Sequence, residues 1–356
     1  MPMIRVLSAV EQVAGRLREE LLHEQRRGLM PGVDRLAADL GVSRKTVDAA
    51  LQLLEKEGLL IPQGVGRRRR IELSGAENSV HGLRVAILPM EPLDRRFDYV
   101  VKMEHELLKA GHAAFYTDKC LSDLGMNPRR VARMVKQNEA DAWVVVAGST
   151  EVLAWFAEQG VPAFALFGRR RGLPLPGVGP DKVPAMAAAT RTLIQLGHRR
   201  IVLLARTGRR LPEPGATERA FLDELAVAGL SPDAYHLPDW EVSIKGFHDR
   251  LNSLFRWTPP TALIIQEAIF YVAALQFCAN RGLRVPHDVS LVCTDADPAF
   301  HWCQPSVAHI RWDSRPVVRR IVRWAAHISL GQEDLRQTLT PAEFVPGGTI
   351  GPARDL

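Results

Sequence analysis

The chain has 356 residues, of which 46% are hydrophobic and 24% are charged, which indicates a globular protein of two or three domains with sizeable cores. No apolar run approaches the roughly 18 residues that a membrane helix needs, and the N-terminus lacks the apolar segment of a signal peptide. We therefore expect a cytoplasmic protein with no membrane partner. The net charge of +6 suits a polyanionic partner without establishing one.

The four cysteines, at positions 120, 278, 293 and 303, form no Cys-x-x-Cys pair and suit a reducing compartment. His301, Cys303 and His309 have the scattered spacing of buried thiols and loop histidines rather than that of metal ligands. We expect no metal and no cofactor.

The first element is a helix, because apolar residues recur at helical spacing from Val10 to Leu21 and Ser8 and Glu11 have the spacing of a capping box. A short helix from about Leu36, a turn at Gly41 and a second helix opened by Ser43 follow. Val47, Ala50, Leu51 and Leu54 recur at i, i+3, i+4 and i+7 and should bury one face of that helix.

The first turn of this second helix carries Ser43, Arg44, Lys45 and Thr46. Arginine and lysine can donate to guanine acceptors or neutralise phosphates, and hydroxyl groups can bind phosphate oxygens. A basic hairpin, or wing, comes next, with Gly64 and Gly66 ahead of the run Arg67, Arg68, Arg69 and Arg70. A run of arginines alone is often a solvated strand end, but behind a helix-turn-helix it favours a contact with the DNA backbone or minor groove.

These residues carry a resemblance to a known family. The segment LGVSRKTVDAALQLLEKEGLL, followed by QGVGRR, resembles the GntR-type winged helix-turn-helix regulators over about the first 73 residues. The resemblance implies DNA contacts at Arg35, Ser43, Arg44, Lys45, Thr46, Gly64, Gly66, Arg67, Arg68 and Arg69. Gly32 and Asp34 replace the serine and arginine that the family usually places before the turn, and Arg35 stands one position later.

Residues 74–82 are small and polar and predict a linker, after which the pattern changes. Helical stretches alternate with short apolar runs, and these runs lie at 85–88, 143–147, 163–167, 201–205, 262–265 and 289–293. Such runs are typical of a parallel sheet covered on both faces, and their number is too large for one compact sheet. We therefore predict an α/β fold of two lobes over residues 83–356, with crossovers near Gly197 and through 309–313.

The segments LGHRRI, RGLRVPHDVSLV and PAEFVPGGT resemble the effector-binding domain of LacI/GalR regulators, which has a two-lobed periplasmic-binding-protein fold. A GntR-type head joined to such a domain is similar to the arabinose-repressor subgroup. In open α/β sheets, ligands bind beyond the carboxyl ends of the strands, which nominates Ser149, Arg169, Arg206, Gln266, Glu267 and Asp295. The resemblance adds Phe97, as an aromatic in the first loop, and Thr217, where the family usually has an effector-binding arginine. Each of these residues also has a structural reading, as a helix cap, a solvated turn or a core side chain.

The sequence thus predicts a transcription regulator, a repressor that binds an operator in double-stranded DNA as a homodimer under the control of a small effector of carbohydrate type. An alternative is a DNA-binding regulator whose second domain only dimerises, since several effector positions depart from the family pattern. An enzyme is the competing class, because some GntR heads are fused to a pyridoxal-phosphate aminotransferase. We expect no catalytic residues, since the strand-end loops offer no Schiff-base lysine setting and the usual catalytic motifs are absent.

Overall fold

The computed structural model describes residues 9–23, 28–56, 59–64, 68–71, 82–210 and 213–354. The chain divides into two compact units, Met1–His81 and Gly82–Leu356, and each is described by itself. The expected linker lies outside the described residues except for Gly82, and so do Ser8, Gly66 and Arg67. No helix within the described ranges is long and apolar enough to cross a membrane.

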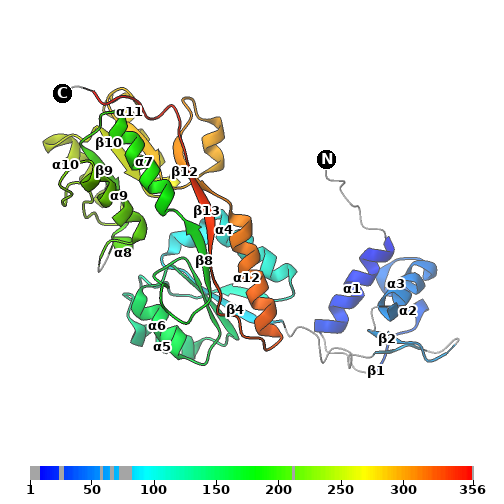
Figure 1. The fold of residues 1–356 in the computed structure, drawn as a ribbon. Helices are drawn as coiled ribbons and strands as arrows, with labels where there is room; N and C mark the ends of the chain where they lie inside the picture. The colour runs from blue at the N-terminus through cyan, green and yellow to red at the C-terminus, as the bar shows by residue number, and fades with distance from the viewer. Residues whose placement is uncertain are drawn as a thin grey trace. The chain divides into compact units, whose positions relative to one another are not determined.

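The N-terminal unit consists of three helices and a small antiparallel sheet (Figure 1). Its elements are α1 (Ala9–His23), β1 (Gly28–Leu29), α2 (Val33–Leu40), α3 (Arg44–Lys56), β2 (Leu60–Ile61) and β3 (Arg70–Ile71). The strands lie in the order β1-β3-β2, so the wing strands gain a partner, β1, that the sequence analysis did not predict.

Helix α3 packs as its apolar periodicity predicts. Val47, Ala50, Leu51 and Leu54 are buried, together with Leu17 of α1, in one hydrophobic core. Gly41 ends α2 in the left-handed conformation, with φ of 64°, and its N–H donates to the carbonyl of Ala37. A residue without Cβ adopts this conformation at little cost, so the chain can turn sharply between α2 and α3.

The C-terminal unit is built on ten hydrogen-bonded strands in the order β5-β4-β6-β7-β8-β13-β12-β11-β10-β9. The strands are β4 (Arg84–Leu88), β5 (Ala113–Tyr116), β6 (Ala142–Val146), β7 (Ala163–Leu166), β8 (Gly177–Asp181), β9 (Ile201–Leu204), β10 (Ala262–Ile265), β11 (Ser290–Cys293), β12 (Ala308–Trp312) and β13 (Gln337–Val345). The strands form two halves, β4–β8 and β9–β12, and β13 joins them into one hydrogen-bonded order. Its first part pairs in parallel with β8, and its last part pairs antiparallel with β12.

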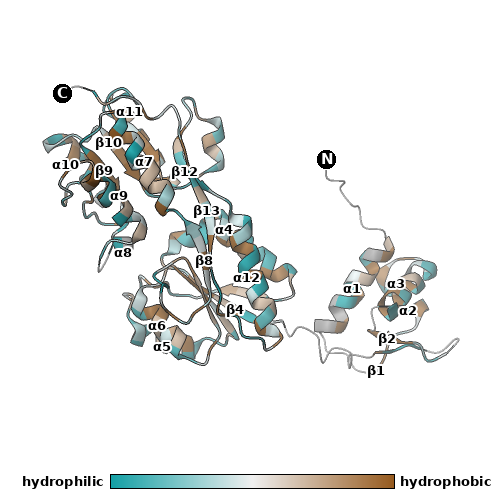
Figure 2. Cartoon of the chain, viewed as in Figure 1, coloured by the Kyte–Doolittle hydropathy of each residue, from teal (hydrophilic) through white to brown (hydrophobic). Residues whose placement is uncertain are grey.

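Helices cover both faces of each half. They are α4 (Asp98–Lys109), α5 (Pro128–Gln137), α6 (Thr150–Glu158), α7 (Val183–Gln195), α8 (Thr207–Arg210), α9 (Ala216–Val227), α10 (Ile244–Trp257), α11 (Ala268–Asn280) and α12 (Ser314–Ser329), with 3-10 turns η2 (Pro92–Arg96) and η3 (Pro298–Trp302). On β4, Val85 packs in the cluster that contains α4 and α12, whereas Ala86 packs in the cluster of α5 and α6. Alternate residues of a strand point to opposite faces, so a continuous apolar run marks a strand buried on both sides. Strands β9 and β10 show this character in Figure 2.

The two halves are two lobes with separate cores. The first lobe contains β4–β8 with α4, α5, α6 and α12, and the second contains β9–β12 with α7, α9, α10 and α11. Helix α7 already packs in the second lobe, so the chain first crosses between Asp181 and Val183, which corrects the expected crossover near Gly197. The second crossing lies at Asp313, between β12 and α12, and β13 makes a third that the sequence analysis did not predict.

Candidate functional sites

The first turn of α3 presents its polar side chains to solvent. Ser43, Arg44 and Lys45 are exposed and Thr46 is half-buried. The Ser43 hydroxyl accepts a hydrogen bond from the Thr46 N–H at 3.1 Å, so Ser43 caps the helix as predicted. Arg44 Nε lies 2.7 Å from Asp34 Oδ1, in an ion pair whose two side chains remain 74% and 72% exposed. Because an exposed ion pair contributes little to stability, Arg44 can exchange Asp34 for another anion at a small cost in free energy.

The wing arginines differ in their surroundings. Arg68 is exposed, whereas Arg69 turns back toward α3, where it donates to Asp48 Oδ1 at 2.9 Å and pairs with Glu55. Burial alone would lower the pKa of Arg69, but the hydrogen bonds and charges of the two carboxylates raise it. Arg69 therefore ties the wing to α3. Gly64, with φ of 109°, is exposed on the chain that leads into the wing.

Arg35 lies on α2, exposed, with Nε 3.8 Å from Asp39 Oδ2. It is on the helix before the turn, outside the first turn of α3. The Arg35 side chain is therefore accessible from solvent.

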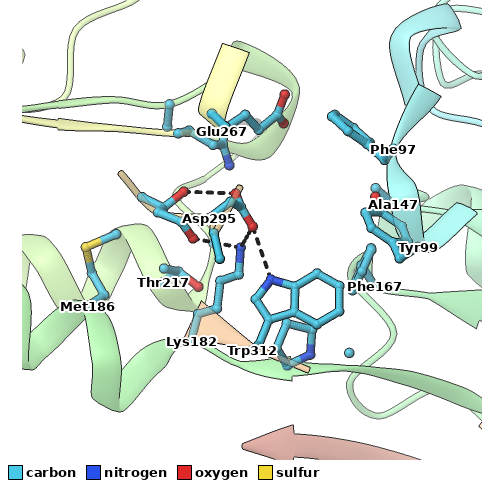
Figure 3. Close-up of a pocket in the computed structure, with 18 of the residues that line it drawn as sticks. Phe97, Tyr99, Ala147, Phe167, Lys182, Met186, Thr217, Glu267, Asp295 and Trp312 are labelled. Atoms are coloured by element: carbon cyan, nitrogen blue, oxygen red, sulfur yellow. Dashed lines mark hydrogen bonds and ion pairs between the residues drawn. The ribbon is translucent and has the colours of Figure 1, made fainter. Parts of the chain in front are cut away.

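A cavity of about 2330 Å³ lies in the C-terminal unit and is lined by residues of both lobes. Seven of the eight nominated ligand residues line it, and these are Phe97, Ser149, Arg169, Thr217, Gln266, Glu267 and Asp295. Figure 3 shows the two sides of the cavity, with Phe97, Tyr99 and Phe167 facing Thr217, Glu267 and Asp295. The strand-end rule thus locates the cavity, because parallel strands of both lobes end there.

Backbone strain is concentrated around this cavity. Among the described residues, four that are not glycine have φ in the left-handed region, and all four line it: Met126, Ala147, Phe167 and Glu267. Side chains with a Cβ rarely adopt this conformation, and such strain is found preferentially at functional sites. Gly168 adds a close approach, because a Cβ there would lie 2.7 Å from the carbonyl oxygen of Gly148.

Asp295 is the centre of a polar cluster on the cavity wall. Its Oδ1 lies 2.5 Å from Lys182 Nζ and accepts a hydrogen bond from Trp312 Nε1 at 3.2 Å (Figure 3). Lys182 also donates to the Thr294 carbonyl at 3.0 Å. Trp312 packs against Tyr99 and Phe167, with ring centroids 5.5 and 5.9 Å away, so an aromatic wall adjoins the charged pair.

Lys182, Tyr99, Phe167 and Trp312 were not predicted as site residues. Lys182 follows β8, whose sequence GVGPD gives no apolar strand signal, and Phe167 lies at the end of a predicted strand but was assigned to that strand. The aromatic contacts join three separate segments, which no local pattern reveals.

Three nominated residues make contacts that are also structural. The Ser149 hydroxyl accepts from the Val152 N–H at 3.3 Å and so caps α6. Gln266 Oε1 accepts from the Arg206 N–H at 2.8 Å. Arg169, on the first lobe, donates to the carbonyl of Glu213 on the second.

Arg206 is not among the residues that line the cavity. Its side chain is 1% exposed and lies among Glu91, Asp94 and Glu267. Burial would lower the pKa of Arg206, but the three carboxylates outweigh this effect and raise it. The side chain is therefore held as a guanidinium within the protein.

Comparisons with known proteins agree with this architecture. Residues 9–67 match the gntR family of bacterial regulatory proteins, and residues 190–350 match the periplasmic binding protein-like domain. The chain is 31% identical over 195 residues to an uncharacterized HTH-type transcriptional regulator in the aml 5' region of Streptomyces limosus, covering 54% of each protein. The chain thus spans about half the length of this curated relative.

Solved structures show the same fold. A LacI family transcriptional regulator from Enterococcus faecium with bound ribose aligns with a TM-score of 0.62 at 16% identity, over 76% of this chain and 100% of that one. A lac repressor dimer bound to operator and the anti-inducer ONPF aligns with a TM-score of 0.59 at 19% identity, over 79% of this chain and 99% of that one.

These findings agree with a chain of two parts, a helix-turn-helix head and a two-lobed domain. The N-terminal unit is thus similar to the gntR family, and the C-terminal unit is similar to periplasmic-binding-protein-like domains and has the fold of LacI family regulators. The relatives and structural neighbours named here are transcription regulators.

Proposed function

We propose that this chain is a transcriptional repressor that binds a two-fold symmetric operator as a homodimer in the cytoplasm and is controlled by a carbohydrate-type ligand held between its two lobes. The observation that carries the DNA-binding part is the exposed first turn of α3, where Ser43, Arg44 and Lys45 stand at the helix N-terminus of a GntR-type head. Residues in this position of a recognition helix reach base edges and phosphates.

Arg44→Ala tests the recognition helix. We expect operator affinity to fall by about 1–3 kcal/mol, and the slope of log affinity against log salt to become shallower by about one if Arg44 contacts a phosphate. Lys56→Ala is the matched control, since Lys56 is exposed at the opposite end of α3. An operator selected from random DNA and titrated at several salt concentrations provides the measurement. Equal affinities and slopes for wild type and Arg44→Ala would reject the assignment.

The cavity supports a ligand with both polar and apolar faces. The aromatic wall of Tyr99, Phe167 and Trp312 suits the C–H face of a sugar ring, and Asp295 and Gln266 offer carboxylate and amide oxygens for hydroxyl groups. The Enterococcus neighbour contains ribose, which agrees with this ligand class. The four strained residues on the cavity wall favour a binding site over an empty cleft.

A thermal-unfolding panel of pentoses, hexoses, sugar acids and sugar phosphates tests the ligand. A compound at about 100 times its dissociation constant should stabilise the protein by roughly 2.7 kcal/mol. The shift should disappear in Asp295→Ala and persist in Asp249→Ala, whose carboxylate is exposed and pairs with Lys245 on α10. A shift that Asp295→Ala leaves unchanged would place the ligand elsewhere.

The alternative, a domain that only dimerises, has support from the contacts of two nominated residues. Asp295 already pairs with Lys182 and Trp312, and Arg206 is buried among carboxylates. A ligand would have to compete with Lys182 and Trp312 for Asp295. It could not reach Arg206 unless the residues around Arg206 moved. Absence of any shift across the panel, with operator binding retained, would favour this alternative.

The dimer has a candidate surface on α4. Val101 and Leu108 lie seven residues apart on one face of this helix and are 50% and 51% exposed. The structural neighbour bound to operator is a dimer, and we propose that a second copy of this chain packs on α4. Sedimentation velocity of the Val101→Glu, Leu108→Glu double variant should show a monomer, whereas Val227→Glu on α9 should leave the dimer intact. A wild type that sediments as a monomer at micromolar concentration would contradict the proposal.

A further inference from the structure

A buried ionic cluster joins the two lobes beside the cavity. Arg206, at the end of β9 in the second lobe, lies with Nη1 2.6 Å from Glu91 Oε2 and Nη2 3.4 Å from Asp94 Oδ1. Both carboxylates belong to the first lobe, on the loop that follows β4. Nη2 also lies 2.5 Å from Oε1 of Glu267, which follows β10 in the second lobe. We call these four residues the interlobe cluster.

Each lobe holds its own part of this cluster in place. Asp94 Oδ2 accepts hydrogen bonds from the N–H groups of Met90 and Glu91, both at 3.0 Å, which leaves Oδ1 directed at Arg206. On the other side, Gln266 accepts from the backbone N–H of Arg206. The charged groups are therefore positioned by separate scaffolds and meet only where the lobes meet.

The charges in the interlobe cluster are almost removed from water. The side chains of Arg206, Asp94 and Glu267 are 1%, 3% and 7% exposed, and Glu91 is 17% exposed. A buried charge that loses its partner is destabilising, because its desolvation is no longer offset by an ion pair. Such a cluster therefore favours the arrangement in which all partners are in contact. Moving the lobes apart would take Arg206 away from two of its three carboxylates.

The Met90 side chain of the first lobe also packs against Gly208 of the second lobe at this seam. A Cβ on Gly208, two residues beyond Arg206, would lie 2.9 Å from Cε of Met90 on the first lobe. Met90, Gly208 and Glu267 all line the cavity, so the seam forms part of its wall. Glu267 has a φ of 67° and faces Phe97 across the cavity in Figure 3.

We infer that the interlobe cluster of Glu91, Asp94, Arg206 and Glu267 is a latch that holds the two lobes together, and that Glu267 connects this latch to the cavity. An occupant that displaces Glu267 would loosen the hold on Arg206, whereas one that fits beside it would leave the latch closed. This role replaces the ligand contact that the sequence suggested for Arg206. The latch does not depend on whether the head binds DNA, so it can be tested without an operator.

The test measures the distance between the lobes in the full chain. Fluorophores on non-canonical amino acids would replace Lys136 on α5 and Lys245 on α10, which are exposed and belong to the first and second lobe (Figure 1). Energy transfer in single molecules would be recorded for wild type, Arg206→Met and Glu91→Gln. Arg320→Met is the matched control, because Arg320 is also a buried arginine, 7% exposed, but pairs with Asp334 within the first lobe.

We expect lower mean transfer or a broader distribution in Arg206→Met and Glu91→Gln, and the wild-type distribution in Arg320→Met. Glu91→Gln decides the matter if Arg206→Met fails to fold, since Glu91 is the most accessible member of the cluster and glutamine keeps its size. A wild-type distribution in folded Glu91→Gln would overturn the latch. The same change in Arg320→Met would also overturn it, because general destabilisation would then explain the opening.

Discussion

The two units of the chain use charged residues in opposite ways. In the head, Arg35 and Arg44 are 79% and 74% exposed, and their partners are exposed too. In the two-lobed domain, Arg206 and Arg320 are 1% and 7% exposed and hold carboxylates inside the protein. Exposed charges remain available to a polyanion, whereas buried ones determine how the fold closes. The same residue type is therefore left accessible in one unit and forms an internal connection in the other.

The largest effect should come from the buried arginine that lies within one lobe. Arg320 makes two hydrogen bonds to Asp334, at 2.9 and 2.8 Å, and one to the Arg336 carbonyl at 2.7 Å. Arg320→Met would leave Asp334 buried without this partner, and we expect a loss of about 3–5 kcal/mol in the free energy of unfolding. Chemical denaturation monitored by tryptophan fluorescence would measure it.

Arg191 provides the control for Arg320, because it is an exposed arginine with a carboxylate partner in the same unit. Arg191 pairs with Glu224 at 2.5 Å, but its side chain is 57% exposed, so Arg191→Met should cost no more than about 1 kcal/mol. Similar losses for the two variants would mean that burial does not separate the two kinds of arginine.

The sequence predicts the head better than the two-lobed domain for a physical reason. The core and the exposed turn of α3 both follow from one helical period, so Val47 and Ser43 are assigned from their neighbours alone. In the second unit, six buried strands were predicted from their apolar runs. Strands β5, β8 and β13 were missed. The sequences of β8 and β13, GVGPD and QTLTPAEFV, are interrupted by glycine, proline or polar residues, and β5 (Ala113–Tyr116) is a short, only partly buried strand at the edge of the sheet.

The strands that were not predicted explain why some residues of the cavity wall were not predicted either. The strand ends indicated residues that line the cavity, but Lys182 follows the unpredicted β8, and β13 is the strand that joins the lobes. Two partners of Arg206, Glu91 and Asp94, lie more than 100 residues away in the chain, and only the fold brings them beside it. Local sequence patterns do not reveal contacts between residues that lie so far apart in the chain.

Arg69 is the exception in the head and gives the next effect in size. It belongs to the basic run of the wing, yet it is 17% exposed and bonds to Asp48 and Glu55. Arg69→Met should destabilise the head by about 1.5–3 kcal/mol, the usual cost of losing hydrogen bonds to charged groups. Arg68→Met, at an exposed position, should leave the stability of the head unchanged and lower only DNA affinity. Thermal unfolding and operator titration of both variants would separate the two roles, and a stable Arg69→Met with weakened DNA binding would assign Arg69 to the DNA surface.

Ser43 caps α3 and is also proposed to contact DNA, so two substitutions are needed to separate these roles. Ser43→Ala removes the cap on the Thr46 N–H and should cost about 1 kcal/mol in stability of the head. Ser43→Asp keeps a capping oxygen but adds a negative charge where phosphates are expected. It should preserve the melting temperature and still weaken operator binding. Wild-type DNA affinity in Ser43→Asp would remove Ser43 from the DNA surface.

The smallest effect concerns pH and is expected only in the two-lobed domain. His112 and His198 are buried there, and burial lowers the pKa of both below the ordinary value of 6.5. The unfolded chain then binds protons that the folded chain does not, so stability is complete above about pH 6.5 and falls as the pH drops below it. From pH 7 to pH 6 each histidine should contribute at most about 0.7 kcal/mol to this loss.

His112→Asn tests this contribution, because asparagine can still accept the hydrogen bond that the Leu83 N–H donates to His112 Nδ1 at 3.2 Å. The variant should lose less stability than wild type between pH 7 and pH 6, when both are unfolded by denaturant at each pH. His105→Asn, at an exposed position on α4, should keep the wild-type dependence. If His112→Asn and His105→Asn gave the same dependence, the buried imidazole would not be the group that titrates. Buried and exposed side chains would then differ in their effect on stability for arginine but not for histidine.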